Sequence, residues 1–288
     1  MAGSTSTKEE ANPPKVLEQD LAGKNAIVTG ASRGIGRAIA LHLALRGASI
    51  LGTCSSPSSI QHIDALNSEV RDLYASTHLN APRVVGLDAN LLSAETPQRL
   101  ADAVKQEFGG ALHILVNNAA YDEMRPVGEL DAEYIQRSLI GNIQTPVLYM
   151  DIFFRNNFFQ PDSRIVNIGS EMTRGGIMPT SAFGFFTSTK SAIESMTRTW
   201  ADVLGKHPTS KGTTVNVLLV GATSTEAFTN ANKDSAELVD HIVSRLSVGD
   251  RMGTPEDAAN VTGLLVSERA GWVTGSVISA NGGSGKVL

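Results

Sequence analysis

Cysteine is nearly absent from this 288-residue sequence, which contains only Cys54. A single cysteine excludes an internal disulfide and is typical of a reducing compartment, so we expect a cytoplasmic protein. Long apolar runs are missing too: no stretch has the length of a membrane span, and the N-terminus lacks the apolar core of a signal peptide. Aromatic residues make up 5% of the chain and the formal net charge is −5, which gives no indication of nucleic-acid binding.

The remaining composition is that of an ordinary globular protein, with 41% hydrophobic and 18% charged residues. Stretches typical of strands and helices alternate along most of the chain, which predicts one α/β domain over residues 21–288. Residues 1–20 are polar and include Pro13 and Pro14, so we expect them to form a disordered tail.

The most informative stretch is residues 25–36, Asn-Ala-Ile-Val-Thr-Gly-Ala-Ser-Arg-Gly-Ile-Gly. Its apolar, β-branched start predicts a buried strand, and a helical apolar pattern begins directly behind the glycines. This arrangement presents backbone N–H groups and the positive end of a helix to a dinucleotide pyrophosphate. Gly30, Gly34 and Gly36 permit the tight turn and the close approach of the backbone. A glycine-rich helix start without a ligand is the alternative interpretation.

The spacing Thr-Gly-x-x-x-Gly-x-Gly resembles the glycine motif of the short-chain dehydrogenase/reductase family. Residues 117–120, Asn-Asn-Ala-Ala, resemble that family's Asn-Asn-Ala-Gly motif and follow a predicted strand at 112–116. The resemblance covers about residues 21–284 and implies a single-domain, Rossmann-type α/β fold with a doubly wound, mostly parallel sheet. The sequence predicts further strands at 48–53, 83–88, 164–170, 213–219 and 275–283, and helices at 60–75, 94–108, 131–156 and 185–206.

The end of the second predicted strand bears on the choice of cofactor. An acidic residue at this place binds the ribose hydroxyl of NAD, but here the chain reads Cys-Ser-Ser. Ser55 and Ser56 offer hydroxyls and Arg33 offers a cation to a 2′-phosphate, which favours NADP(H); serines that only cap the next helix are the alternative. The resemblance implies a further set of cofactor-binding residues: Ser32, Ile35, Asp88, Ala89, Asn118, Ala119, Lys190, Val220, Gly221 and Thr223.

One position departs from the family's active-site signature, Tyr-x-x-x-Lys. Here the segment reads Phe186-Thr-Ser-Thr-Lys190, so the helical spacing is kept and the tyrosine is replaced. Phenylalanine has no proton to donate to a developing alkoxide. The resemblance assigns substrate binding to Ser170, a backbone carbonyl for a relay water to Asn142, and ribose binding to Lys190. We therefore expect the catalytic set to be Ser170, Lys190, Asn142 and Phe186.

Four hypotheses follow for the chemistry. The enzyme reduces an acceptor that needs no proton, such as an iminium ion or a conjugated system. A substitute acid replaces the tyrosine, with Tyr121, Asp122, Glu171 and Thr187 as candidates. The cofactor-bound protein guides a non-redox cyclisation, as atypical family members in alkaloid assembly do. The phenylalanine is an engineered change that traps substrate. We favour an NADPH-dependent reductase of a small, apolar secondary metabolite, with no metal.

Three further expectations concern the surroundings of the site. The apolar loop 172–185 is predicted to line the substrate pocket, and residues 226–247 resemble the family's variable lid. Helices 131–156 and 185–206 occupy positions that pair across two-fold axes in the family, so a homodimer or homotetramer is expected. The expected partner is a small-molecule substrate, with neither nucleic acid nor membrane.

Overall fold

The computed structural model describes residues 13–175, 184–231 and 236–285. Within these residues seven strands form one sheet in the order β3-β2-β1-β4-β5-β6-β7, and every neighbouring pair is parallel. The strands are β1 (Asn25–Val28), β2 (Ser49–Cys54), β3 (Val84–Asp88), β4 (Leu112–Asn117), β5 (Phe159–Ser170), β6 (Thr214–Val220) and β7 (Val277–Ala280).

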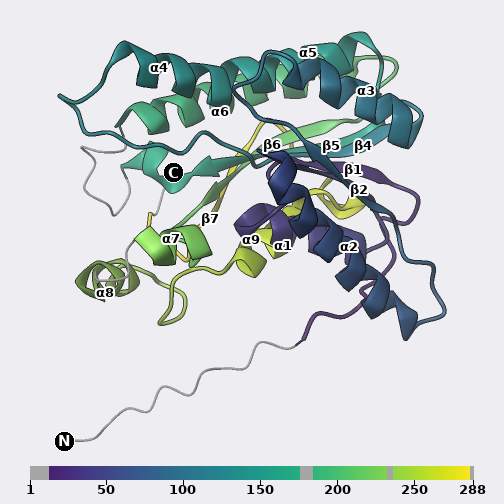
Figure 1. Ribbon diagram of the computed structural model, residues 1–288, viewed down its shortest axis with the longest axis horizontal. Helices are drawn as coiled ribbons and strands as arrows, with labels where there is room; N and C mark the ends of the chain where they lie inside the picture. The colour runs from purple at the N-terminus through teal and green to yellow at the C-terminus, as the bar shows by residue number, and fades with distance from the viewer. Residues whose placement is uncertain (1–12, 176–183, 232–235, 286–288) are drawn as a thin grey trace, which may run out of the picture.

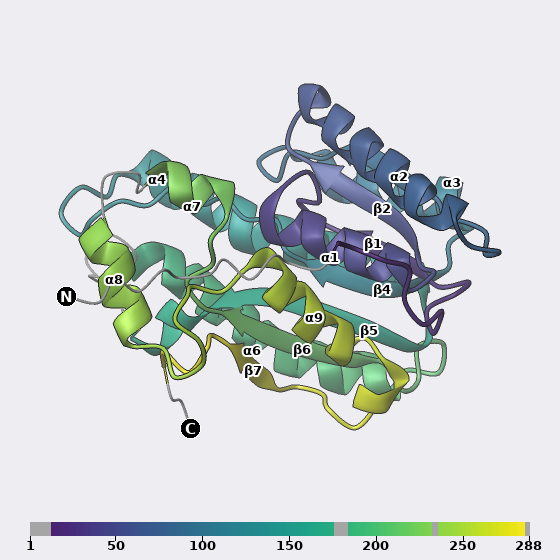
Figure 2. The same ribbon diagram turned by 90° about the horizontal axis from the view of Figure 1, so that it is seen from below.

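Helices cover both faces of this sheet (Figure 1). One face carries α1 (Gly34–Leu45), α2 (Ile60–Ala75) and α9 (Pro255–Leu265), which lie nearest the viewer in Figure 2. The other face carries α3 (Thr96–Phe108), α4 (Ala132–Leu139), α5 (Thr145–Arg155) and α6 (Gly184–Lys206). Two short helices, α7 (Glu226–Ala231) and α8 (Ala236–Ser244), lie at one end of the molecule.

The core consists of two apolar layers separated by the sheet. In β1, Ala26 and Val28 belong to the layer under α1, α2 and α9, while Ile27 belongs to the layer under α3, α5 and α6. Successive side chains of a strand point to opposite faces, so a continuous apolar run serves both layers. This is why the short β-branched run of β1 forms a central strand.

The strand order indicates where on the sheet a ligand would bind. Because all strands are parallel, their carboxyl ends lie at one edge of the sheet. From β1 the chain continues to β2 and β3 on one side and then crosses from β3 to β4 on the other side of β1. Ligands of such folds bind at this switch point. The predicted Rossmann-type, doubly wound sheet is confirmed, with a wholly parallel arrangement.

The expected N-terminal tail is shorter than predicted. Leu17 packs against the core and its N–H donates to the carbonyl of Leu45 at 3.0 Å, and Asp20 forms an ion pair with Arg46. Residues 16–20 of the predicted tail therefore contact the C-terminal end of α1 and the residue that follows it. Residues 1–12 of the predicted tail lie outside the described part of the chain.

Two other expected segments differ in detail. The helix predicted at 131–156 consists of α4, a π-helical turn at residues 140–144, and α5. The predicted lid at 226–247 contains α7 and α8, while residues 232–235 are outside the described ranges, as are residues 176–183 of the predicted substrate loop.

The strand β7 lies at the outer edge of the sheet and pairs only with β6 among the described strands. Trp272, in the turn before β7, is 98% exposed. Across the described ranges, the helices are too short or too polar to traverse a lipid bilayer.

Candidate functional site

The glycine turn after β1 has the geometry that the sequence predicts. Gly30 and Gly34 have φ values of 70° and 56°, a region that disfavours side chains. Gly36 lies inside α1, where a Cβ would overlap the carbonyl oxygen of Gly30 and the side-chain amide of Asn118. The first two glycines therefore shape the turn, and the third lets α1 approach the end of β4.

A hydrogen-bond network ties this turn to the segment after β4. The hydroxyl of Thr29 accepts from the backbone N–H groups of Asn118 and Ala119 at 2.9 and 3.0 Å. The Asn118 side chain donates to the carbonyl of Thr29 at 2.9 Å, and the N–H of Gly30 donates to the Thr53 hydroxyl at 3.0 Å. Asn118 thus braces the turn. Thr29 is the first residue of the glycine motif, and Thr53 is a supporting residue that the sequence does not indicate.

A cavity of about 410 Å³ opens at the carboxyl ends of β1 to β4. It brings together seven predicted cofactor residues: Gly30, Ser32, Arg33, Ser55, Ala89, Asn118 and Ala119. Its wall also includes Tyr121 and Asp122, which follow the second motif. Arg33 is exposed there and forms no ion pair with any described residue, whereas Arg37 on the same helix is paired with Glu69.

Three predicted cofactor residues have their side chains engaged elsewhere. The Ser56 hydroxyl is within 3.0 Å of the hydroxyls of Ser58 and Ser59, at the start of the next helical turn. Asp88 pairs with Arg99 of α3 at 2.6 Å, and this guanidinium lowers the pKa of the carboxyl. Ile35 packs against the core. The assignment of Ser56, Asp88 and Ile35 to the cofactor stays a prediction.

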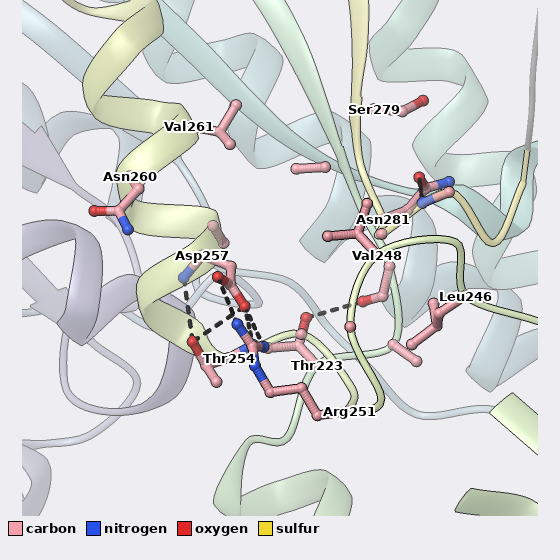
Figure 3. A pocket seen from close by; sticks show the side chains of 18 residues that line it. Thr223, Leu246, Val248, Arg251, Thr254, Asp257, Asn260, Val261, Ser279 and Asn281 are labelled. Atoms are coloured by element: carbon pink, nitrogen blue, oxygen red, sulfur yellow. Dashed lines mark hydrogen bonds and ion pairs between the residues drawn. The ribbon is translucent and has the colours of Figure 1, made fainter. Parts of the chain in front are cut away.

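Gly221 and Thr223 line a separate cavity of about 450 Å³, between the end of β6, α9 and the turn after β7. Figure 3 shows Thr223 and Asn281 on its wall, with Arg251, Thr254 and Asp257 joined at the start of α9. Thr254 and Asp257 form a capping box, which satisfies the first backbone N–H groups of that helix. Val220 pairs with Ser170 and Ala280 in the sheet and packs against the core.

Asn142 lies in the π-helical turn between α4 and α5. Its buried side chain accepts from the N–H of Tyr121 at 2.7 Å and donates to the Tyr121 carbonyl at 2.9 Å. Pro146 has no N–H, so the usual helical donor to the Asn142 carbonyl is missing. The side chain therefore fixes the backbone on the cavity wall, and the carbonyl lacks its α-helical partner.

Phe186 and Lys190 share one face of α6, one turn apart. The Phe186 ring is buried, and the Lys190 ammonium lies 5.6 Å from its centre. Lys190 donates to the carbonyl of Ile168 on β5 at 2.9 Å. Burial lowers the pKa of Lys190 to about 8, against the opposing effect of the Asp122 carboxylate. The Ser170 hydroxyl, at the end of β5, accepts from the N–H of Met172 at 3.3 Å.

Comparison with known proteins identifies the family to which this chain belongs. A family model described as enoyl-(acyl carrier protein) reductase matches residues 30–284. The chain belongs to the short-chain dehydrogenase/reductase family. It is 34% identical to the short-chain dehydrogenase/reductase FrzI of a Cladobotryum species, over 94% of this chain and 97% of the relative.

Two solved structures are similar to this chain in fold. A blue fluorescent protein from a metagenomic library, in complex with NADPH, has a TM-score of 0.77 and 32% identity, with 93% of this chain and 100% of that one covered. The reductase LugOII, which catalyses keto-reduction during lugdunomycin biosynthesis, has a TM-score of 0.76 and 30% identity, covering 92% and 98%.

The four candidate substitute acids of this dehydrogenase differ in whether their acidic groups are already hydrogen-bonded. The Tyr121 hydroxyl donates to Glu123, and burial together with this bond raises the pKa of Tyr121. Thr187 donates to the carbonyl of Gly184 at 2.9 Å. Glu171 is buried, and both its oxygens accept hydrogen bonds. Among the four candidate acids only Asp122 is exposed on the cavity wall with no hydrogen bond to another described residue.

A series of hydrogen bonds between buried polar side chains connects α6 of this short-chain dehydrogenase to the central strands. The Tyr149 hydroxyl donates to Asn117 at 2.7 Å, Asn117 donates to Asn167 at 2.6 Å, and Asn167 donates to Thr197 at 2.8 Å. This series of hydrogen bonds connects α5, β4, β5 and α6, and each of its four side chains has a partner. It therefore fixes α6, which carries Phe186 and Lys190, against the two central strands.

Proposed function

We propose that this protein is an NADPH-dependent reductase of a small, apolar metabolite whose acceptor needs no proton from the enzyme. The observation that carries the proposal is the buried Phe186 ring beside the Lys190 ammonium. The family's glycine motif for cofactor binding is retained. At the position of the family's proton donor, the chain has Phe186, whose side chain is a hydrocarbon. An iminium ion becomes a neutral amine on hydride transfer, so it requires no acid.

The carboxylate of Asp122 supports a cationic acceptor. Asp122 places an exposed carboxylate on the wall, and this carboxylate acts on Lys190 by raising its pKa. A carboxylate that offsets the lysine charge lowers the repulsion between the site and an iminium ion. An aromatic ring such as Phe186 also attracts cations through its face.

The test is a comparison of acceptors with the chain as written and with Phe186→Tyr. We expect NADPH-dependent reduction of a cyclic iminium such as 1-pyrroline, protonated in acidic buffer, and little reduction of simple ketones. A tyrosine at position 186 restores a general acid, which typically contributes about 10²–10⁴ in rate. Phe186→Tyr should therefore add ketone reduction without accelerating the iminium reaction. Phe186→Leu is the control, because it changes the ring and adds no proton.

Fast ketone reduction by the unaltered chain would contradict the proposal and favour a substitute acid. LugOII, which reduces a keto group, makes this the competing hypothesis. Asp122 is then the first residue to replace, since its carboxylate is exposed on the wall. Product formation without NADPH consumption would favour the cyclisation hypothesis. Genomic sequencing of the source would decide whether Phe186 is natural or engineered.

The preference for NADP(H) over NAD(H) belongs to the same proposal. Arg33 and Ser55 face the cavity, and no acidic side chain follows β2. The NADPH complex of the blue fluorescent protein supports this choice. LugOII, whose reaction belongs to the biosynthesis of lugdunomycin, supports a place in secondary metabolism. The single cysteine keeps the cytoplasm as the proposed compartment.

A homodimer or homotetramer is the proposed assembly. An apolar groove of about 270 Å³ lies between α5 and α6 and is lined by Val147, Met150, Phe154, Trp200 and Val203, among others. Leu148 and Val203 are 42% and 45% exposed on these helices. A second copy would bury this surface in a four-helix contact. Light scattering that gives only a species of about 30 kDa at micromolar concentration would contradict the assembly.

A further inference from the structure

Glu171 is a buried carboxylate between three segments at the carboxyl edge of the sheet. It follows Ser170 directly and begins the short helical turn η3 (Glu171–Arg174). Only 6% of its surface is exposed. A buried carboxylate requires hydrogen-bond donors, so the groups that bind it identify what it holds in place.

The first donor belongs to the segment after β6. The N–H of Ala222 donates to Oε1 of Glu171 at 3.1 Å. Ala222 lies between Gly221 and Thr223, the two residues of this segment that the sequence assigns to the cofactor. The carboxylate therefore fixes the backbone of the predicted cofactor segment from the side of β5.

The second donor belongs to the turn after β7. The hydroxyl of Ser284 donates to Oε2 of Glu171. This turn also contacts the same segment directly: a Cβ at Gly221 would lie 2.7 Å from Cα of Asn281, and the N–H of Gly221 donates to the Ala280 carbonyl at 3.1 Å. Asn281 closes the turn by accepting from the N–H of Gly283 and donating to the carbonyl of Gly285.

We propose that Glu171 is a positioning residue that joins the C-terminal turn, residues 281–285, to the cofactor segment 221–223. The inference rests on the proposed function, because it assumes that this segment contacts the bound nicotinamide cofactor. Glu171 does not donate a proton to substrate; it holds the backbone that contacts the cofactor. Ser284 acts through Glu171, so the end of the chain contributes to cofactor affinity without touching the cofactor.

The test compares NADPH binding and turnover in Glu171→Ala, Glu171→Gln and Ser284→Ala. Glutamine keeps an oxygen for the Ala222 N–H, and its amide can donate to a rotated Ser284 hydroxyl. We expect about a tenfold rise in the NADPH dissociation constant for Glu171→Ala, about threefold for Ser284→Ala, and less than threefold for Glu171→Gln. The value of kcat at saturating cofactor should change less than threefold in each variant. Ser244→Ala is the matched control, since that exposed hydroxyl bonds only to the His241 carbonyl of its own helix.

A double variant sharpens the test. If both residues act through one connection, Glu171→Ala combined with Ser284→Ala should bind NADPH no more weakly than Glu171→Ala alone. An unchanged dissociation constant in folded Glu171→Ala would overturn the inference, even if its melting temperature falls. So would a loss of about 10² or more in kcat for Glu171→Gln, because that result assigns proton transfer to the carboxyl. Failure of the unaltered protein to bind NADPH would instead contradict the proposed function.

Discussion

Arg33 is an exposed guanidinium at the start of α1, on the wall of the cavity that contains the glycine turn. A charged hydrogen bond to a 2′-phosphate contributes about 1.5–3 kcal/mol. We expect Arg33→Ala to weaken NADPH binding about 10- to 100-fold and to leave NADH binding nearly unchanged. Titration with both cofactors measures this difference, with the exposed Arg71→Ala on α2 as control. Equal losses for the two cofactors would show that Arg33 does not contact the phosphate.

Lys190 gives the site a pH dependence with a defined direction. Burial lowers its pKa from 10.5 to about 8, so the ammonium is lost in the folded protein as the pH rises through about 8. Between that pH and about 10.5 the unfolded chain holds this proton and the folded chain does not. This residue's contribution to stability therefore rises with pH in the same window, while ammonium-dependent function falls.

We therefore expect kcat/KM with NADPH to decrease as the pH rises through about 8. Lys190→Arg keeps a positive charge throughout and should remove this decrease. Asp122→Asn should move the midpoint to lower pH, because the Asp122 carboxylate raises the pKa of Lys190. The measurement is the pH profile of initial rates from pH 6 to 10. An identical decline in Lys190→Arg would assign the titration to another group.

At the scale of single elements, the turn at residues 140–144 depends on Asn142. Asn142→Ala leaves the N–H and the carbonyl of Tyr121 without their partners, and we expect a loss of about 2–4 kcal/mol in the free energy of unfolding. Asn142→Asp should lose a similar amount, since its second oxygen would face the Tyr121 carbonyl. Urea denaturation measures both. Asn156→Ala, which removes an exposed bond to Ile152 of its own helix, should change stability by less than about 0.5 kcal/mol.

The elements differ in how far the sequence predicts them. The central strands β1, β4 and β6 are recognisable because buried parallel strands are continuous apolar runs between turns. The first half of β5, which begins at Phe159, is polar and was not predicted as strand. The π-helical turn was predicted as ordinary helix, because the apolar pattern of 131–156 continues through it. The ion pair of Asp88 with Arg99 was not predicted, because Arg99 lies on the separate helix α3. Residues 16–20 look like a polar tail until Arg46 and Leu45 are folded beside them.

The candidate site, too, is only partly predictable from the sequence. The sequence predicts the residues around the glycine turn, since they are neighbours along the chain or follow adjacent strands. The role of Glu171 depends on Ala222 and Ser284, which are 51 and 113 residues away. Such a contact follows from the packing of three strand ends and has no local pattern.

On the scale of the whole molecule, acid should destabilise the fold through His42. Burial and the nearby Arg46 lower the pKa of His42 from 6.5 to about 4, while Asp20 acts in the opposite direction. Between these values the unfolded chain binds a proton that the folded chain excludes. Stability should therefore fall as the pH drops from about 6.5 to 4, by at most about 3.4 kcal/mol from this residue.

Urea denaturation at pH 7.0, 5.5 and 4.5 tests this, with His42→Gln compared with the unaltered protein. The variant should lose less stability between pH 7.0 and 4.5, because glutamine does not titrate. His78→Gln is the control for replacing a histidine by glutamine, since His78 is exposed. Parallel curves for His42→Gln and the unaltered protein would contradict the assignment.

The two tryptophans give the molecule a built-in optical reporter. Trp272 is 98% exposed before β7, and Trp200 lines the apolar groove between α5 and α6. Indole emission shifts to shorter wavelength when water leaves its surroundings. In a Trp272→Phe protein the emission comes from Trp200 alone, so dilution from a dimer to a monomer would appear as a red shift. The same signal would follow dissociation of the subunits in real time, without a label.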